Sequence, residues 1–117
     1  ILDCQVALIE IAIAWYYRED SIPGPIGSRY PTITLFQFSR ANDGYFVIAI
    51  GNENLWGLLC RTLDAPDLLK NCRFTDNASR SANQQDLEKI LEEYFGEHSE
   101  EYWLESLRQA GIPCGPI

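Results

Sequence analysis

The chain has 117 residues, of which 46% are hydrophobic and 22% charged, and its formal net charge is −8. This length supports one hydrophobic core, and the composition is that of a globular protein. An excess of acidic residues repels phosphate backbones and anionic lipids, so nucleic-acid binding and attachment to a membrane surface are disfavoured. The chain contains no methionine, and we expect it to be a piece of a larger protein.

Residues 1–20 are predicted to form one long, mostly apolar connecting helix. Asp3, Gln5 and Glu10 interrupt the apolar run, and a basic start and a cleavage motif are lacking, which argues against a signal peptide or a membrane span. A helix that is apolar over most of its circumference must be buried on several sides. We therefore expect it to dock on another part of a larger chain or on a second subunit.

Residues 21–31 are predicted to be a linker loop, because their density of Pro and Gly excludes a helix or a central strand. The residue types in 24–30 suit a backbone that approaches another group closely. A plain connection between two structural units is the alternative interpretation.

Residues 32–117 are predicted to form a small α+β domain that begins with a β-hairpin. An apolar strand around residues 33–38 is followed by a turn at Asn42-Asp43-Gly44, whose residue types tolerate positive φ. The returning strand, residues 45–50, is almost continuously apolar. We expect it to be covered on both faces.

Helices are predicted for most of the remaining sequence. Asn52 or Asn54 caps a helix that ends near residue 63, Pro66 starts a short helix, and Phe74 anchors the loop that follows. One long helix is expected over residues 78–95, with Ala82, Leu87, Ile90, Leu91, Tyr94 and Phe95 buried. Ser99 caps the last helix, whose core side is Trp103, Leu104 and Leu107. The fold class is α+β: a small antiparallel sheet, made of the hairpin and a third strand, packed with helices.

No catalytic site is evident from the residue types. The single histidine, His98, lies in a polar stretch and is expected to be solvated, and without paired Cys or His ligands we expect no metal site. Cysteine nucleophiles at positions 60, 72 and 114 are disfavoured because no nearby histidine or cluster of basic residues suggests a lowered thiol pKa. The four cysteines are expected to be buried and reduced.

Several motifs in order resemble the family III CoA-transferases, which include formyl-CoA transferase, carnitine CoA-transferase and alpha-methylacyl-CoA racemase. The resemblance covers nearly the whole chain. It rests on Leu2-Asp3-Cys4-Gln5-Val6-Ala7-Leu8, Tyr30-Pro31, Asp43-Gly44, Ile48-Ala49-Ile50-Gly51-Asn52, Trp56, Leu59-Cys60, Arg73-Phe74, Arg80, Asn83, Trp103 and Gly111-Ile112-Pro113-Cys114-Gly115-Pro116.

The resemblance implies that the chain is the small domain of such an enzyme and the helix leading into it. The intact enzyme would transfer CoA from an acyl-CoA to a carboxylic acid through an aspartyl intermediate. The catalytic aspartate would belong to a large domain that precedes this region, so this chain alone is expected to be inactive. The implied setting is intracellular, cytoplasmic or mitochondrial, in an interlocked homodimer that binds no cofactor tightly and uses coenzyme A thioester as substrate.

Gly27, Ser28 and Arg29 are the candidate substrate-binding residues that the resemblance implies. They occupy about the position of a glycine-rich loop in formyl-CoA transferase, although the run of consecutive glycines is absent. Gly27 would allow close backbone approach, and Arg29 would pair with a substrate carboxylate. Two alternatives remain. One is an acyl-CoA racemase of the same fold, disfavoured because Arg40 stands near the place of a supporting carboxylate; the other is a non-catalytic interaction module.

Overall fold

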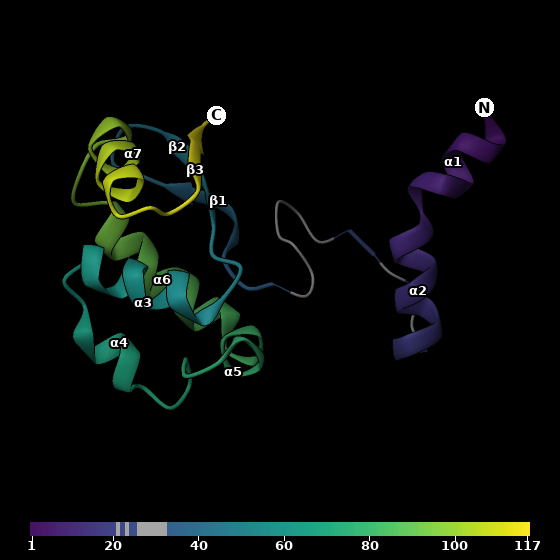
Figure 1. The fold of residues 1–117 in the computed structure, drawn as a ribbon, viewed down its shortest axis with the longest axis horizontal. Helices are drawn as coiled ribbons and strands as arrows, with labels where there is room; N and C mark the ends of the chain where they lie inside the picture. Colours follow the sequence, from purple (N-terminus) through teal and green to yellow (C-terminus); the bar gives the residue numbers. More distant parts are fainter. Residues whose placement is uncertain (21, 23, 26–32) are drawn as a thin grey trace.

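The computed structural model describes residues 1–20, 22, 24–25 and 33–117 (Figure 1). Three strands and seven helices occur in the described part of the chain. In order they are α1 (Leu2–Leu8), α2 (Glu10–Glu19), β1 (Phe36–Arg40), β2 (Tyr45–Ala49), α3 (Glu53–Thr62), α4 (Pro66–Lys70), α5 (Asn77–Ala82), α6 (Gln84–Phe95), α7 (Glu100–Gln109) and β3 (Cys114–Pro116). The α+β class is confirmed.

The three strands form one antiparallel sheet in the order β1-β2-β3. In the hairpin, Phe38 pairs with Val47 and Arg40 with Tyr45, and the backbone N–H of Ala41 donates to the carbonyl of Gly44 at 2.9 Å. β3 pairs with β2, with Gly115 opposite Val47. The predicted hairpin and the third strand are both present.

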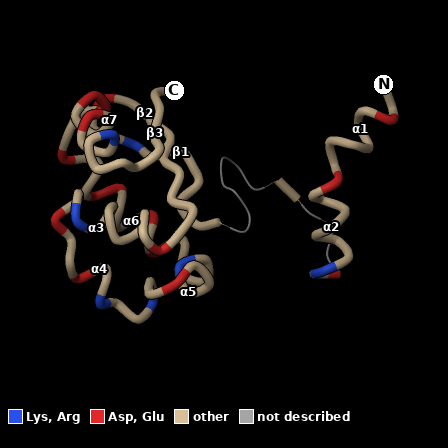
Figure 2. Tube along the Cα trace, in the orientation of Figure 1, with Lys and Arg blue, Asp and Glu red and all other residues tan. Residues whose placement is uncertain are grey.

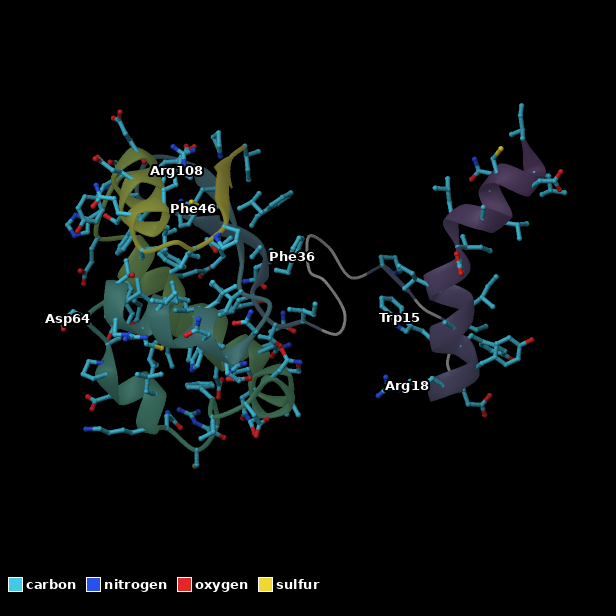
Figure 3. The ribbon with its side chains drawn as sticks, in the orientation of Figure 1. Trp15, Arg18, Phe36, Phe46, Asp64 and Arg108 are labelled. Atoms are coloured by element: carbon cyan, nitrogen blue, oxygen red, sulfur yellow. The ribbon has the colours of Figure 1, made fainter. Side chains whose placement is uncertain are left out.

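The two faces of the sheet differ in burial. Phe46 and Ile48 on β2 are fully buried beneath the helices, and Figure 3 shows Phe46 on the side of α7. On the opposite face Phe38 and Tyr45 are both 52% exposed. The expectation that β2 is covered on both faces is therefore wrong, because the described helices pack on one face only.

The start of the helical part follows the sequence prediction. The Asn52 side chain accepts a hydrogen bond from the backbone N–H of Leu55 at 2.9 Å and caps α3. Leu59 and Cys60 on α3 are fully buried, α4 begins at Pro66, and Phe74 is completely buried in the loop that follows.

The single long helix predicted over residues 78–95 is wrong, because the structure has α5 and α6 with a break at Asn83. The amide of Asn83 donates to the carbonyl of Ser79 at 2.9 Å and to that of Arg73 at 3.4 Å. An Asn side chain that bonds nearby backbone offers an alternative to continued helix, and Asn83 has a non-helical ψ of 27°. The break leaves Ala82 exposed, whereas Leu87, Leu91 and Phe95 on α6 are buried as predicted.

α7 joins the core through aromatic side chains. Ser99 caps it by accepting from the N–H of Tyr102, and the indole N–H of Trp103 donates to the carbonyl of Phe95 at 2.8 Å. The rings of Phe46, Phe95 and Trp103 stack edge to face with centroids 5.1 and 5.3 Å apart. The helix ends before Gly111, whose φ of +76° favours glycine.

The long connecting helix predicted over residues 1–20 is also not found, since α1 and α2 are separate helices that meet at Ile9. Ile9 has φ −95° and ψ 9°, and its N–H donates to the carbonyl of Val6 in a tighter turn. α1 buries none of its residues, and Leu2 and Leu8 are largely exposed. Isolated helices of this length gain little stability without packing, and β-branched isoleucines add little helix propensity. No helix in the described residues is long and apolar enough to cross a membrane.

Candidate functional site

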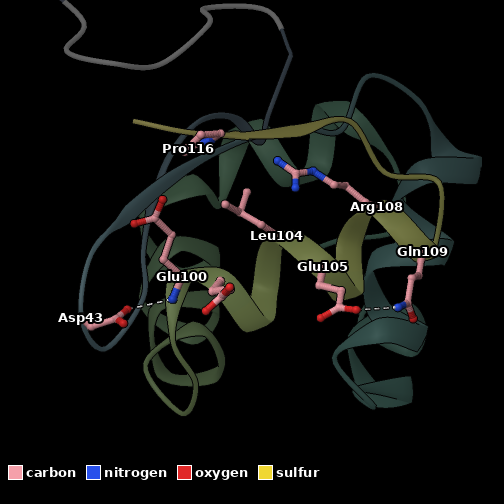
Figure 4. A pocket seen from close by; sticks show the side chains of 8 residues that line it. Asp43, Glu100, Leu104, Glu105, Arg108, Gln109 and Pro116 are labelled. Atoms are coloured by element: carbon pink, nitrogen blue, oxygen red, sulfur yellow. Dashed lines mark hydrogen bonds between the residues drawn. The ribbon is translucent and has the colours of Figure 1, made fainter.

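An open groove of about 810 Å³ lies between α7 and the turn of the hairpin, and Figure 4 shows the side chains around it. The lining residues are Asp43, Glu100, Glu101, Leu104, Glu105, Arg108, Gln109 and Pro116. Its position follows from the fold, because α7 packs against β2 and β3.

Hydrogen bonds tie the groove's polar residues to one another and to the backbone. Asp43 accepts from the backbone N–H of Glu100 at 2.8 Å, and the Gln109 amide donates to Glu105 at 3.2 Å. Glu100 and Glu101 lie in the first turn of α7, where the helix dipole stabilises negative charge. These carboxylates therefore have structural roles that need no substrate.

The charge of the groove does not suit the substrates of acyl transfer. Four carboxylates line it against a single cation, Arg108, and Figure 2 shows the same acidic excess over α7. Phosphate and carboxylate groups are repelled by such a surface. The lining also contains no hydroxyl, thiol or imidazole that would serve as a nucleophile or as a histidine base.

A second polar cluster lies inside the domain around Arg80, which is 2% exposed. Its guanidinium donates to both carboxylate oxygens of Glu53, at 2.7 and 2.9 Å, and to the carbonyl of Phe74 at 3.1 Å. The guanidinium carbon also lies 5.0 Å from the centre of the Trp56 ring. Hydrogen bonds from Arg80 hold the pKa of Glu53 below its usual range, against a smaller opposing effect of desolvation.

The sequence alone assigns no role to the Arg80 cluster. Arg80 enters only as a landmark of the family resemblance, and its partner Glu53 is 27 positions away in the chain. No local pattern links an arginine of α5 to the first turn of α3. Only the burial of Arg80 in the structure identifies the pair as part of the core.

Burial disfavours the thiolate form of two of the four cysteines. Burial raises the pKa of the Cys60 thiol to about 12 and also raises the pKa of Cys114. Cys4 and Cys72 are exposed and Cys114 is half-buried, so the expectation of burial is confirmed only for Cys60. All four are free thiols.

His98 is exposed, as expected, and its ring stacks on Tyr102 with centroids 4.0 Å apart. Among the described residues, no group of three or more His, Cys, Asp or Glu is arranged to hold a metal ion. The candidate substrate-binding residues Gly27, Ser28 and Arg29 lie outside the described residues.

Comparison with known proteins identifies the family. All 117 residues match the sequence profile of CoA-transferase family III. The chain is 33% identical to the acetyl-CoA:oxalate CoA-transferase of Acetobacter aceti over 98% of its own length and 30% of that protein. It is 32% identical to the human succinyl-CoA:glutarate CoA-transferase over 100% of its own length and 27% of that protein.

A solved structure supports the same assignment. A CAIB/BAIF family protein from Brucella suis superposes with a TM-score of 0.83 at 33% identity, over 98% of this chain and 30% of that one. The chain thus spans about 30% of the length of these relatives. The profile match covers every residue, and we conclude that the chain belongs to CoA-transferase family III.

Proposed function

We propose that this chain is the small domain of an enzyme that transfers CoA from an acyl-CoA to a carboxylic acid through an aspartyl intermediate. The observation that carries the proposal is the full-length match to relatives that are CoA-transferases and are about three times as long. The groove is lined by four carboxylates and a single cation, and this negative charge would repel acyl-CoA and carboxylic acids, which agrees with chemistry located in another part of the enzyme. The chain alone is therefore inactive.

The exposed apolar surface supports a place inside a larger assembly. α1 has no buried residue, and Phe38 and Tyr45 project from the free face of the sheet. Apolar areas of this kind mark contact surfaces. We infer that they pack against the remainder of the enzyme, which is a homodimer.

The test compares the purified chain with a full-length protein that contains it. Both are assayed for CoA transfer from succinyl-CoA or acetyl-CoA to oxalate and glutarate, the substrates named for the relatives. We expect turnover only from the full-length protein, together with trapping of an acyl-enzyme by hydroxylamine. Turnover by the chain alone would contradict the proposal.

An acyl-CoA racemase of the same fold is the main alternative. A racemase exchanges the proton on the α-carbon, so full-length enzyme in heavy water would incorporate deuterium into 2-methylacyl-CoA without any acceptor acid. Arg40 does not supply the carboxylate that such chemistry would use, and its guanidinium carbon lies 6.0 Å from the centre of the Tyr45 ring. We expect no deuterium incorporation.

Arg29 provides a residue-level test of substrate binding. In the full-length enzyme, Arg29→Gln removes the charge that pairs with the acceptor carboxylate, so KM for the acid rises about tenfold or more while KM for acyl-CoA stays constant. Arg29→Lys retains the charge and should recover part of the affinity. Equal effects on both substrates would argue against this role and for the plain linker.

A non-catalytic interaction module is the third possibility. It requires that the chain bind a partner protein without any enzymatic domain attached to it. A full-length protein that carries the catalytic aspartate before this region would contradict that interpretation.

A further inference from the structure

Thr34 lies just before β1 and is fixed to α5 by two of its polar groups. Its backbone N–H donates to the side-chain oxygen of Asn77 at 3.1 Å, and its hydroxyl is 2.5 Å from that of Ser81. Thr34 is only 2% exposed, whereas Ser81 is exposed and Asn77 is half-buried, so both bonds are partly buried. We call this pair of contacts the Thr34 anchor.

The next residue, Leu35, has a strained backbone. Its φ is +75°, a left-handed conformation that is uncommon for residues other than glycine and asparagine. The side chain is 1% exposed, and the carbonyl accepts from the N–H of Ile50 at 3.1 Å. A strained conformation of this kind persists only where surrounding contacts enforce it, and it is often part of a switch.

α5 has too few residues to be stable by itself, so its own attachment matters. Arg80, within α5, joins this helix to α3 through Glu53 and to the preceding loop through the carbonyl of Phe74. Asp76 caps α5 by accepting from the N–H of Ser79 at 2.8 Å. The Thr34 anchor is therefore built on a helix that is itself held by a buried arginine.

We propose that the Thr34 anchor is a conformational latch that holds Leu35 in its left-handed conformation. Release of the two Thr34 contacts lets Leu35 return to negative φ, which frees residues 33–35 in front of β1 while β2 and the core remain folded. The latch thereby fixes the backbone conformation at the start of the sheet. This inference does not depend on CoA transfer, because it concerns the described residues alone.

The latch is tested by amide hydrogen exchange of individual residues, measured by NMR on the protein. Thr34→Val removes the hydroxyl at nearly constant shape, and Ser81→Ala removes its partner. Both variants should speed the exchange of the amides of residue 34 and Ile50 about tenfold relative to the Phe46 amide of the central strand, which corresponds to loss of one partly buried hydrogen bond. Gln85→Ala, at an exposed position of α6, is the matched control and should leave these ratios unchanged.

A second pair of variants tests the strain independently. Leu35→Ala and Leu35→Gly both remove the side chain, but only glycine adopts positive φ freely. We expect Leu35→Gly to unfold at a higher temperature than Leu35→Ala, the reverse of the usual order. The proposal is overturned if the Thr34 and Ile50 amides change only in step with Phe46, or if the alanine variant is the more stable.

Discussion

The carboxylate of Asp43 accepts a hydrogen bond from the backbone N–H of Glu100 at 2.8 Å, across 57 positions of the chain. The turn of the hairpin thereby supplies a cap to α7 in addition to Ser99. The neighbouring N–H of Asn42 donates to the carbonyl of His98 at 3.1 Å. These two bonds fix the turn against the start of the helix.

The first prediction concerns this long-range cap. Asp43→Ala should lower the free energy of unfolding by about 1 kcal/mol, the usual effect of losing a helix cap. Asp43→Asn keeps an acceptor and should cost only a few tenths of a kcal/mol, about the contribution of the charge near the helix end. Urea unfolding of both variants measures the difference. Equal losses would show that the charge, and not the hydrogen bond, stabilises α7.

The second prediction compares two ion pairs that differ in burial. Glu53→Gln leaves the buried Arg80 without its charged partner, and we expect a loss of about 2 kcal/mol, reduced from the value for a fully buried pair because Glu53 is 55% exposed. Asp86→Asn breaks the surface pair with Arg73 and should cost no more than about 0.5 kcal/mol. Denaturant unfolding under identical conditions checks both values, and a larger effect at Asp86 would contradict the ranking.

The third prediction is a pH dependence that depends on Glu53. Because its pKa is lower in the folded protein, its ionised form stabilises the fold above its ordinary pKa of about 4.5. The contribution disappears as the pH falls through the lowered value. The stability difference between the original protein and Glu53→Gln should therefore be largest near neutral pH and shrink on acidification. A difference that stays constant throughout an acid titration would refute this assignment.

The fourth prediction compares two buried tryptophans. The indole N–H of Trp103 donates to the carbonyl of Phe95, whereas that of Trp56 is buried and has no hydrogen-bond partner among the described residues. Replacement by phenylalanine removes similar volume at both sites but breaks a hydrogen bond only at Trp103. Trp103→Phe should be more destabilising than Trp56→Phe by about 1 kcal/mol, as measured by thermal and urea unfolding. The opposite order would mean that the contact of Trp56 with Arg80 outweighs the hydrogen bond.

Features decided by neighbouring residues can be predicted from the sequence. Asn52 and Ser99 cap helices because their side chains reach N–H groups three positions later. The hairpin turns at Asn42-Asp43-Gly44 as predicted, although none of these three residues adopts the positive φ on which the prediction rested. Phe74 is predictable as an anchor, because the single aromatic side chain of a polar loop is stabilised by packing into the core. Such features depend only on short spacings along the chain.

Features decided by distant contacts escape sequence-based prediction. The amide of Asn83 bonds the carbonyl of Ser79, four positions earlier, and that of Arg73 in the preceding loop, so only the second bond depends on the tertiary structure, and the apolar pattern does not mark the helix break. The pairing of Arg80 with Glu53 requires α3 and α5 to be adjacent. The apolar pattern continues through Ile9 and therefore predicts one long helix. The length of a helix in such a segment is set by its packing against other elements and not by the pattern, and the structure has two helices instead.

The candidate site shows the same division. The family resemblance indicates the kind of enzyme and points to residues 27–29 for substrate binding. The groove beside α7 arises from residues 43, 100–109 and 116, and its acidic lining is apparent only when these segments meet. Its chemistry follows from the fold rather than from any motif.

The pairing of β3 with β2 has a consequence for the order of folding. Ile48 in the central strand lies opposite Cys114, so the sheet gains its third strand only after nearly all of these residues have been synthesised. Until then β1 and β2 form a two-stranded hairpin, which is marginally stable in water. Closure of such distant pairs is slow, and we therefore expect the pairing of β3 with β2 to form late in the folding of this domain.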